Sequence, residues 1–285
     1  MNRTKTITQR VAFASCSLLG YGTLALLVAI LGFMIYHGIG VLSWEFLTEE
    51  PREGMTKGGI FPAIVGTLCL VVGSMLIAFP LGVMSAIYTT EYAGRGWLVS
   101  LIRIMTNNLA SIPSIVFGLF GMALFVQKLG FGDSILAGSL TLGLLALPLI
   151  IRTTEEALKA VPQTYRLGSY ALGATKLQTI VRVVLPAAMP NILTGLILSV
   201  GRVSGETAPI LFTAAAYFLP SLPSSIFDQV MALPYHLYVI ATSGTDLEAT
   251  RPMAYGTALV LIIIVLVLNL LATALRLSIH RKQAN

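Results

Sequence analysis

Residues 199–213 read SVGRVSGETAPILFT and lie inside a long apolar run that nevertheless carries Arg202 and Glu206. An isolated arginine at the centre of a bilayer costs from about 2.5 kcal/mol by insertion scales to more than about 10 kcal/mol in simulation. A helix here would place five residues on one stripe, because they recur at steps of three and four: Ser199, Arg202, Glu206, Pro209 and Thr213. We predict that this stripe, apart from Pro209, lines a substrate pathway. The alternative interpretation is a structural ion pair between Arg202 and Glu206, which would neutralise itself inside a helical bundle.

Composition places the chain in a membrane. The 285 residues are 56% hydrophobic and 11% charged, whereas about a quarter of a soluble domain is charged. A soluble enzyme is therefore excluded. The net charge of +6 does not indicate a nucleic-acid partner, because the cations lie at the ends of apolar runs, as in membrane proteins with cationic cytoplasmic loops. Neither Cys16 nor Cys69 lies near another Cys or a His at ligand spacing, so we expect no metal and no cofactor.

Six apolar runs predict an all-α integral membrane fold with six transmembrane helices, since about 20 apolar residues cross a bilayer as a helix. The first run is too long for the apolar region of a signal peptide, and we expect it to stay uncleaved. Pro80 interrupts the second run, and Pro113 would bend the third. The runs cover residues 11–36, 60–90, 107–126, 134–151, 189–215 and 253–275. On this count Arg202 lies about 20 Å along the fifth span, near the bilayer centre.

The distribution of charge predicts the orientation. Thirteen Lys and Arg residues lie at the two termini and in residues 91–103 and 152–186, against four in the alternate loops. Because cytoplasmic loops carry the excess of positive charge, both termini and residues 152–186 are predicted to be cytoplasmic. We expect residues 1–57 to form an N-terminal helix with an extracytoplasmic loop, and residues 58–280 to form the transmembrane core. The protein is thus predicted to be a multi-pass protein of the inner (plasma) membrane, in contact with lipid.

Residues 152–186 form a polar block in which apolar residues recur near helical spacing, which indicates short amphipathic helices at the membrane surface. The chain has no G-x-x-x-x-G-K-[ST] phosphate loop, so any ATP hydrolysis must come from another subunit. It also has no Ser/His/Asp or metal-ligand cluster that would indicate an enzyme. We therefore expect a transporter subunit with a cytoplasmic docking loop and no catalytic residues.

This docking loop resembles the "EAA" loop of ABC-importer permeases, which docks coupling helices onto an ATP-binding subunit. The matching positions include Gly173, which fills the glycine of the family pattern, and Leu185–Pro186, which fill its terminal pair. The slot that holds glutamate in the family pattern holds Leu167 here, and Arg166 is the nearest charge. The resemblance implies that the ATPase-coupling loop includes Arg166, Gly173, Ala174, Leu185 and Pro186.

Four further motifs, in the right order, resemble the phosphate-specific permeases and, within them, the A-type member of a two-permease pair: GGIFPAIVGTL (58–68), FPLGVMSAIYTTEYA (79–93), LASIPSIVFGLFG (109–121) and GRVSGETAPILFT (201–213). The resemblance implies a type I ABC importer permease that forms half of a pathway for inorganic phosphate. It also implies three protein partners: a second permease in a heterodimer, ATPase subunits, and an extracytoplasmic phosphate-binding protein.

Three alternatives remain open at this point. The same architecture could carry sulfate, molybdate or phosphonate, because one arginine attracts any oxyanion. A self-contained anion channel or proton-coupled carrier could use Arg202 and Glu206 to relay ions. A structural or signalling membrane protein could use its cytoplasmic loop to recruit a regulator.

Overall fold

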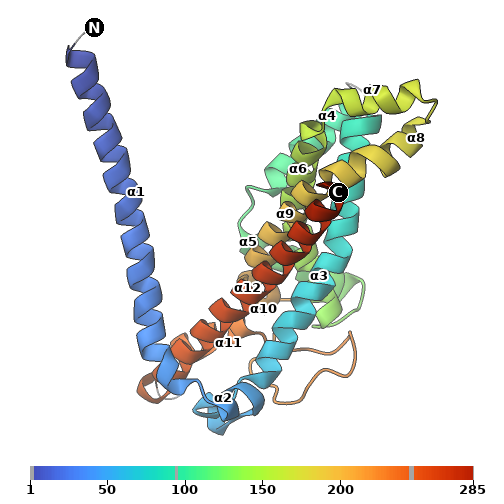
Figure 1. Ribbon diagram of the computed structural model, residues 1–285. Helices are drawn as coiled ribbons and strands as arrows, with labels where there is room; N and C mark the ends of the chain where they lie inside the picture. The colour runs from blue at the N-terminus through green and yellow to red at the C-terminus, as the bar shows by residue number, and fades with distance from the viewer. Residues whose placement is uncertain (1–2, 94–95, 244–246, 285) are drawn as a thin grey trace.

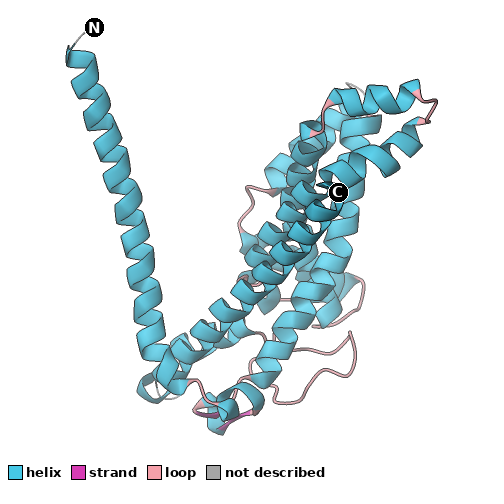
Figure 2. Cartoon of the chain, viewed as in Figure 1, coloured by secondary structure: helices cyan, strands magenta, loops and turns pink. Residues whose placement is uncertain are grey.

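The long apolar runs fold into long helices, shown in a computed structural model that describes residues 3–93, 96–243 and 247–284 (Figure 1). Within those ranges, five helices are long and apolar enough to cross a membrane, or six if a bent pair counts as one span. The five candidate spans are Gln9–Val41, Phe61–Tyr92, Ile135–Ala160, Lys176–Val203 and Thr250–Ser278. This confirms the predicted helical membrane fold, and Figure 2 shows how completely helix dominates it.

The α-helices in chain order are α1 (Arg3–Gly38), α2 (Trp44–Thr48), α3 (Phe61–Ile87), α4 (Trp97–Leu109), α5 (Ser114–Gly121), α6 (Ile135–Ala160), α7 (Gln163–Ala171), α8 (Lys176–Thr179), α9 (Leu185–Val203), α10 (Ala208–Leu211), α11 (Leu233–Thr242) and α12 (Leu247–Ala284). Three π-helical turns extend α3, α5 and α8: η3 (Tyr88–Tyr92), η4 (Met122–Lys128) and η5 (Ile180–Val184). The polar loop after α1 holds two 3₁₀ turns, η1 (Ile39–Val41) and η2 (Glu53–Met55), and two paired antiparallel strands, β1 (Pro51–Arg52) and β2 (Lys57–Gly58).

Helices α3 and α6 form the centre of the bundle, and they approach each other closely where small residues lie between them. A Cβ added to Gly73 would lie 2.4 Å from Ser139 Oγ, and one added to Gly82 would lie 2.6 Å from Ile150 Cγ2. Small residues let membrane helices approach until their backbones nearly touch. The main buried cluster grows around this pair and joins Met75 of α3 to residues of α6 and α9.

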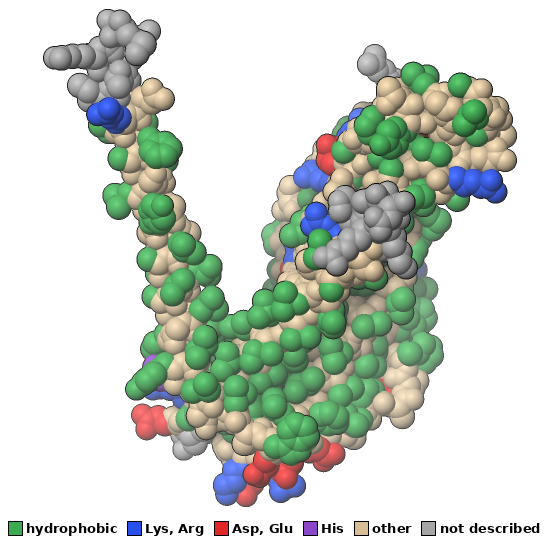
Figure 3. Space-filling model, viewed as in Figure 1, with side chains coloured by type: hydrophobic (Ala, Val, Ile, Leu, Met, Phe, Trp, Pro, Cys, Tyr) green, Lys and Arg blue, Asp and Glu red, His purple; other side chains and the backbone are tan. Residues whose placement is uncertain are grey.

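Helix α1 stands apart from the bundle along most of its length (Figure 1). None of its most apolar 18-residue window is buried. It is attached near its C-terminal end, where Gly38 packs against the backbone of Tyr255 and the His37 ring lies 5.1 Å from the Tyr255 ring. In Figure 3 apolar side chains cover α1 and the bundle face beside it, whereas charged side chains gather mostly toward the two ends of the molecule.

Two expected spans differ from the structure. The third was expected over residues 107–126 with a bend at Pro113. The bend is present, at 107° between α4 and α5, but the helix is broken over residues 110–113 and α4 begins earlier, at Trp97. A proline disfavours the helical conformation of the residue before it, here Ile112, so the helix breaks between Leu109 and Ser114. The fifth was expected over residues 189–215, but it runs over Lys176–Val203 and stops at the turn formed by Ser204 and Gly205.

The predicted surface block is also shorter than residues 152–186. Its first part continues α6 to Ala160, and its last part begins the span that starts at Lys176. Residues 161–175, with α7 as their helical core, are what remains between the two spans. The proposed boundary between residues 57 and 58 stays a prediction.

Candidate functional site

Arg202 lies in the last turn of α9, beside the point where the helix stops. Its neighbour Val203 belongs to the same buried cluster as Met75 and Ala146, which lie near the middle of α3 and α6 respectively. Ala188 packs near Leu158 and Gly195 packs against Thr153, so α9 runs antiparallel to α6, and Arg202, seven residues past Gly195, lies level with the middle of α6. Its side chain is 43% exposed in this chain, so the guanidinium is not enclosed by the bundle.

The expectation that one helix carries the whole stripe is wrong, because α9 ends at Val203. Glu206 lies in the following turn, and Pro209 lies near the start of α10. Arg202 Nε nevertheless reaches Glu206 Oε1 across the turn at 3.5 Å, the outer limit of a hydrogen bond. The carboxylate is only 17% exposed. The pair is thus close but loosely held, and among the described residues no other side-chain hydrogen bond of Arg202 is found.

Ser199 and Thr213 do not share that exposure. Both side chains are fully buried, and both hydroxyls donate to carbonyls one turn earlier: Ser199 to Gly195 at 2.9 Å and Thr213 to Pro209 at 2.9 Å. The backbone of Thr213 also accepts a hydrogen bond from Ser134 N at 2.9 Å, at the start of α6. The structure therefore brings Arg202 and Glu206 together and gives Ser199 and Thr213 positions within the packing around them.

An uncovered face of α9 extends from Arg202 toward the end of the molecule that carries α7. Asn191, Leu198 and Arg202 are exposed and Thr194 is half-exposed, while the helix buries residues on its other side. Asn191 and Arg202 are 11 residues apart, about three helical turns, so they share one face. Polar side chains on an uncovered face of a membrane helix indicate contact with protein or water rather than with acyl chains.

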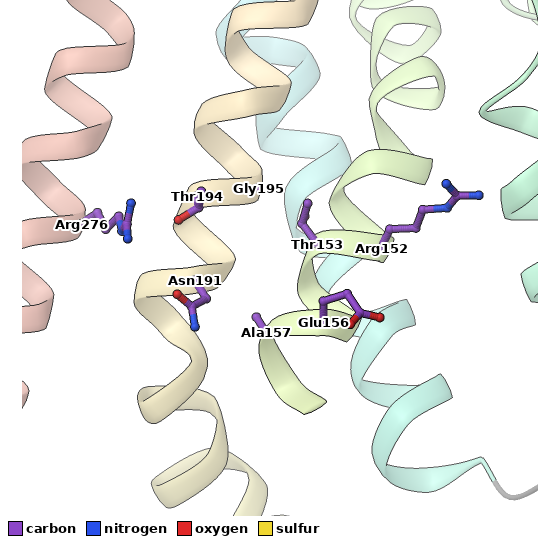
Figure 4. A pocket seen from close by; sticks show the side chains of 8 residues that line it. All are labelled: Arg152, Thr153, Glu156, Ala157, Asn191, Thr194, Gly195 and Arg276. Carbon is purple, nitrogen blue, oxygen red and sulfur yellow. The ribbon is translucent and has the colours of Figure 1, made fainter. Parts of the chain in front are cut away.

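A cavity of about 450 Å³ opens beside that face (Figure 4). Asn191 and Thr194 of α9 point toward Arg276 of α12, whereas Arg152 points away from them. Arg152 donates instead to Asn107 Oδ1 of α4. Sequence reasoning did not single out Asn191, Thr194 and Arg276, which line this cavity. The 11-residue spacing between Asn191 and Arg202 was available in the sequence, but the neighbourhood of Arg276 depends on helix packing.

The segment predicted to couple to an ATPase forms a helical hairpin of α7 and α8. Gly173 ends α7 with φ of +79°, the left-handed conformation that favours glycine at a helix C-terminus, and a Cβ there would meet nothing within 4 Å. Thr175 then caps α8 in a reciprocal capping box with Gln178. Exposed apolar side chains line the hairpin: Tyr165, Leu167, Tyr170, Leu172 and Leu177. This surface suits docking onto another protein.

The other expected coupling residues occupy different settings. Ala174 is half-buried in the turn and donates its N–H to Ser169 O at 3.2 Å, while Leu185 and Pro186 begin α9. Arg166, expected as part of the coupling loop because it is the charge nearest the usual glutamate position, points inward, and its side chain is only 10% exposed. It pairs with Glu91, 75 positions earlier in the chain. In the part of the chain that the structure describes, no three His, Cys, Asp or Glu side chains are grouped to hold a metal.

A helical membrane bundle with an exposed cation level with its middle and a hairpin of exposed apolar side chains at one end is typical of a transporter permease. Residues 78–285 match the family described as "Binding-protein-dependent transport system inner membrane component", and the chain belongs to that family. It is a transporter component of the inner membrane and not an enzyme.

Named relatives agree with this assignment. The chain is 36% identical to "Probable ABC transporter permease protein YqgI" of Bacillus subtilis (strain 168), over 99% of each chain. It is 40% identical to "Phosphate transport system permease protein PstA" of Mycobacterium leprae (strain TN), over 90% of this chain and 84% of that protein. Among solved structures, a bacterial ABC transporter that imports the acidic polysaccharide alginate aligns with a TM-score of 0.66 and 15% identity, covering 96% of this chain and 98% of that one. The last likeness concerns the fold alone.

Proposed function

We propose that this protein is a permease subunit of an ATP-driven importer of inorganic phosphate, in which it forms half of the translocation pathway. The observation that carries the proposal is the 40% identity to a phosphate transport permease over most of both chains. The exposed arginine near the middle of the bundle supplies a chemical reason, because guanidinium binds phosphate oxygens by charge-assisted and bidentate hydrogen bonds.

Phosphate is proposed to follow the uncovered face of α9. Arg202 attracts the anion at the middle of the bundle, and Asn191, Thr194 and Arg276 offer polar contacts further toward the α7 end. Glu206 is proposed to select phosphate over sulfate. Phosphate keeps at least one proton near neutral pH and can donate it to a carboxylate, whereas sulfate offers only acceptors and like charge.

The second permease of a heterodimer is proposed to cover both α1 and the α9 face. Helix α1 carries no charge between Val11 and Tyr36, and its most apolar 18-residue window is wholly unburied, so this stretch requires a partner or lipid around it. The polar α9 face cannot lie against acyl chains without cost. A partner helix between α1 and the bundle would cover apolar surface while enclosing Arg202 in a shared pathway.

The α7–α8 hairpin is proposed to dock onto the ATPase subunit, with an extracytoplasmic phosphate-binding protein at the opposite end. The start of α1 and the end of α12 lie toward the same end of the molecule as this hairpin in Figure 1. The excess of Lys and Arg at these termini and in residues 152–186 supports a cytoplasmic location for that end.

Vesicles containing the assembled complex test this function. Uptake of radiolabelled phosphate should require ATP, the partner subunits and the binding protein, and unlabelled phosphate should compete better than sulfate, molybdate or phosphonate. Preferred uptake of one of the other oxyanions would replace phosphate as the substrate while keeping the permease assignment.

A further inference from the structure

The π-helical turn η3, which ends α3, carries a buried charge that reaches into the coupling hairpin. Arg166 Nη2 of α7 lies 2.6 Å from Glu91 Oε1 of η3, and Arg166 Nε lies 3.4 Å from Glu91 Oε2. The two side chains are 10% and 8% exposed. Planar guanidinium facing both oxygens of a carboxylate in a buried setting fixes orientation as well as distance.

Arg166 also holds the end of α6. Its Nη1 donates to Val161 O at 2.9 Å, and its Nη2 donates to Leu158 O at 3.0 Å. The last carbonyls of a helix have no helical donor and need other partners. One side chain on α7 therefore closes the end of α6 while pairing with the end of α3.

Two other residues of η3 extend the same junction. Thr89 Oγ1 donates to Glu155 Oε1 of α6 at 2.7 Å, in a buried position. The Tyr92 ring lies 5.1 Å from Lys176 Nζ at the start of α8, a cation–π contact. Three of the five residues in this turn thus bind three different helices. We call Thr89, Glu91, Tyr92, Glu155, Arg166 and Lys176 the η3 joint.

We propose that the η3 joint carries the movement of the docking hairpin to α3 and α6, with Glu91 and Arg166 as positioning residues that stay paired throughout the transport cycle. This inference rests on the proposed function, in which α7 and α8 dock onto the ATPase. The hairpin presents Leu167 and Leu172 outward and Arg166 inward, so force applied to the outer surface passes through the buried pair. Separating that pair would leave an uncompensated charge, which is strongly unfavourable.

The first test compares Glu91→Gln with Glu53→Gln in the complete complex, reconstituted with binding protein. Glu53 pairs with Lys57 at 2.9 Å, but its side chain is 63% exposed, and the loop between α2 and α3 that holds it lies at the opposite end of the molecule from the hairpin (Figure 1), so it is a matched control. Glu91→Gln should lower phosphate moved per ATP hydrolysed about tenfold, because its buried arginine loses a charged partner. The control should match wild type. Equal coupling ratios in the two variants would overturn the proposal.

The second test distinguishes a transmitted movement from a merely structural contact. Glu91→Cys and Arg166→Cys are combined in a chain whose Cys16 and Cys69 are replaced by Ser, and a short thiol cross-linker is added in the membrane before extraction. Before cross-linking, the double-cysteine variant should move little phosphate per ATP hydrolysed. After cross-linking, this ratio should recover, because α7 and the end of α3 again move together. Cross-linking that leaves coupling low, or lowers it further, would show that the helices must separate and would overturn the proposal. Absence of ATP-driven phosphate uptake in the wild-type complex would instead contradict the proposed function.

Discussion

Gly195 of α9 and Thr153 of α6 lie so close that a Cβ added to the glycine would come 2.0 Å from Thr153 Oγ1 and 2.7 Å from its Cβ. The threonine hydroxyl is already bonded to Leu149 O at 2.8 Å, which limits its freedom to move away. This approach fixes the distance between the helix that carries Arg202 and the centre of the bundle.

Gly195→Ala should therefore destabilise the chain by about 1–3 kcal/mol, the usual cost of overpacking. The thermal unfolding midpoint in detergent is the measurement. Gly22→Ala is the matched control, since a Cβ at Gly22 meets nothing within 4 Å. Combining Gly195→Ala with Thr153→Ala should recover part of the lost stability. If the midpoint of Gly195→Ala equals that of the control, α6 and α9 can move apart at no cost and the prediction is wrong.

Glu206→Gln tests the selection of phosphate over sulfate. The neutral amide removes the like charge that a sulfate ion would meet and adds a donor, so sulfate exclusion should relax when the delivery protein is bypassed or made permissive. Competition by sulfate against labelled phosphate is the measurement. A variant that loses phosphate transport yet still rejects sulfate as strongly as wild type would leave Glu206 as a neutralising partner of Arg202 only.

Gly173 should tolerate asparagine but not valine. With φ of +79° the backbone is left-handed, which asparagine accepts and a β-branched residue does not. We expect Gly173→Val, and the bulkier Gly173→Trp, to lower phosphate uptake per ATP hydrolysed without preventing membrane insertion, while Gly173→Asn stays close to wild type. Normal coupling in the tryptophan variant would show that this hairpin is not the docking element.

His236 should make the chain sensitive to acid. It lies in α11, outside the candidate spans, and burial lowers its pKa from 6.5 to about 4. Between these two values the unfolded chain binds a proton that the folded chain does not, so stability falls as the pH falls from about 6.5 to about 4. The full shift corresponds to about 3 kcal/mol. His236→Gln should flatten the dependence of the unfolding midpoint between pH 7.5 and pH 4.5, and an unchanged slope would contradict the assignment.

The spans at the two ends of the chain were predictable because their apolar runs lack interruptions and are bounded by charge. The glycine of the α7–α8 hairpin was also predictable, since Gly173 follows the C-terminus of α7, where a left-handed residue is required. The end of α9 was not predictable, because the stripe of residues at helical spacing continues past Val203 in the sequence. Gly205 and Pro209 mark the break only once the turn formed by residues 204–207 is seen.

Partners distant in sequence were beyond the reach of pattern reasoning. Arg166 was expected in the coupling loop as the charge nearest the usual glutamate position, and its pairing with Glu91 depends on how η3 meets α7. Of the predicted substrate stripe, only Arg202 and Glu206 remain accessible. The hydroxyls of Ser199 and Thr213 are buried and donate to backbone carbonyls one turn earlier. Helical periodicity shows which residues share a face of a helix, but it does not show which face the neighbouring helices cover.

The most direct test of the central claim measures phosphate uptake into vesicles that contain either this chain alone or the chain with its second permease and ATPase, with binding protein supplied. The account predicts uptake only in the full complex and only with ATP, and loss of that uptake in Arg202→Ala while the complex still assembles. Phosphate movement by the chain alone without ATP would indicate a self-contained carrier. Full ATP-driven uptake in Arg202→Ala would remove the arginine from the pathway.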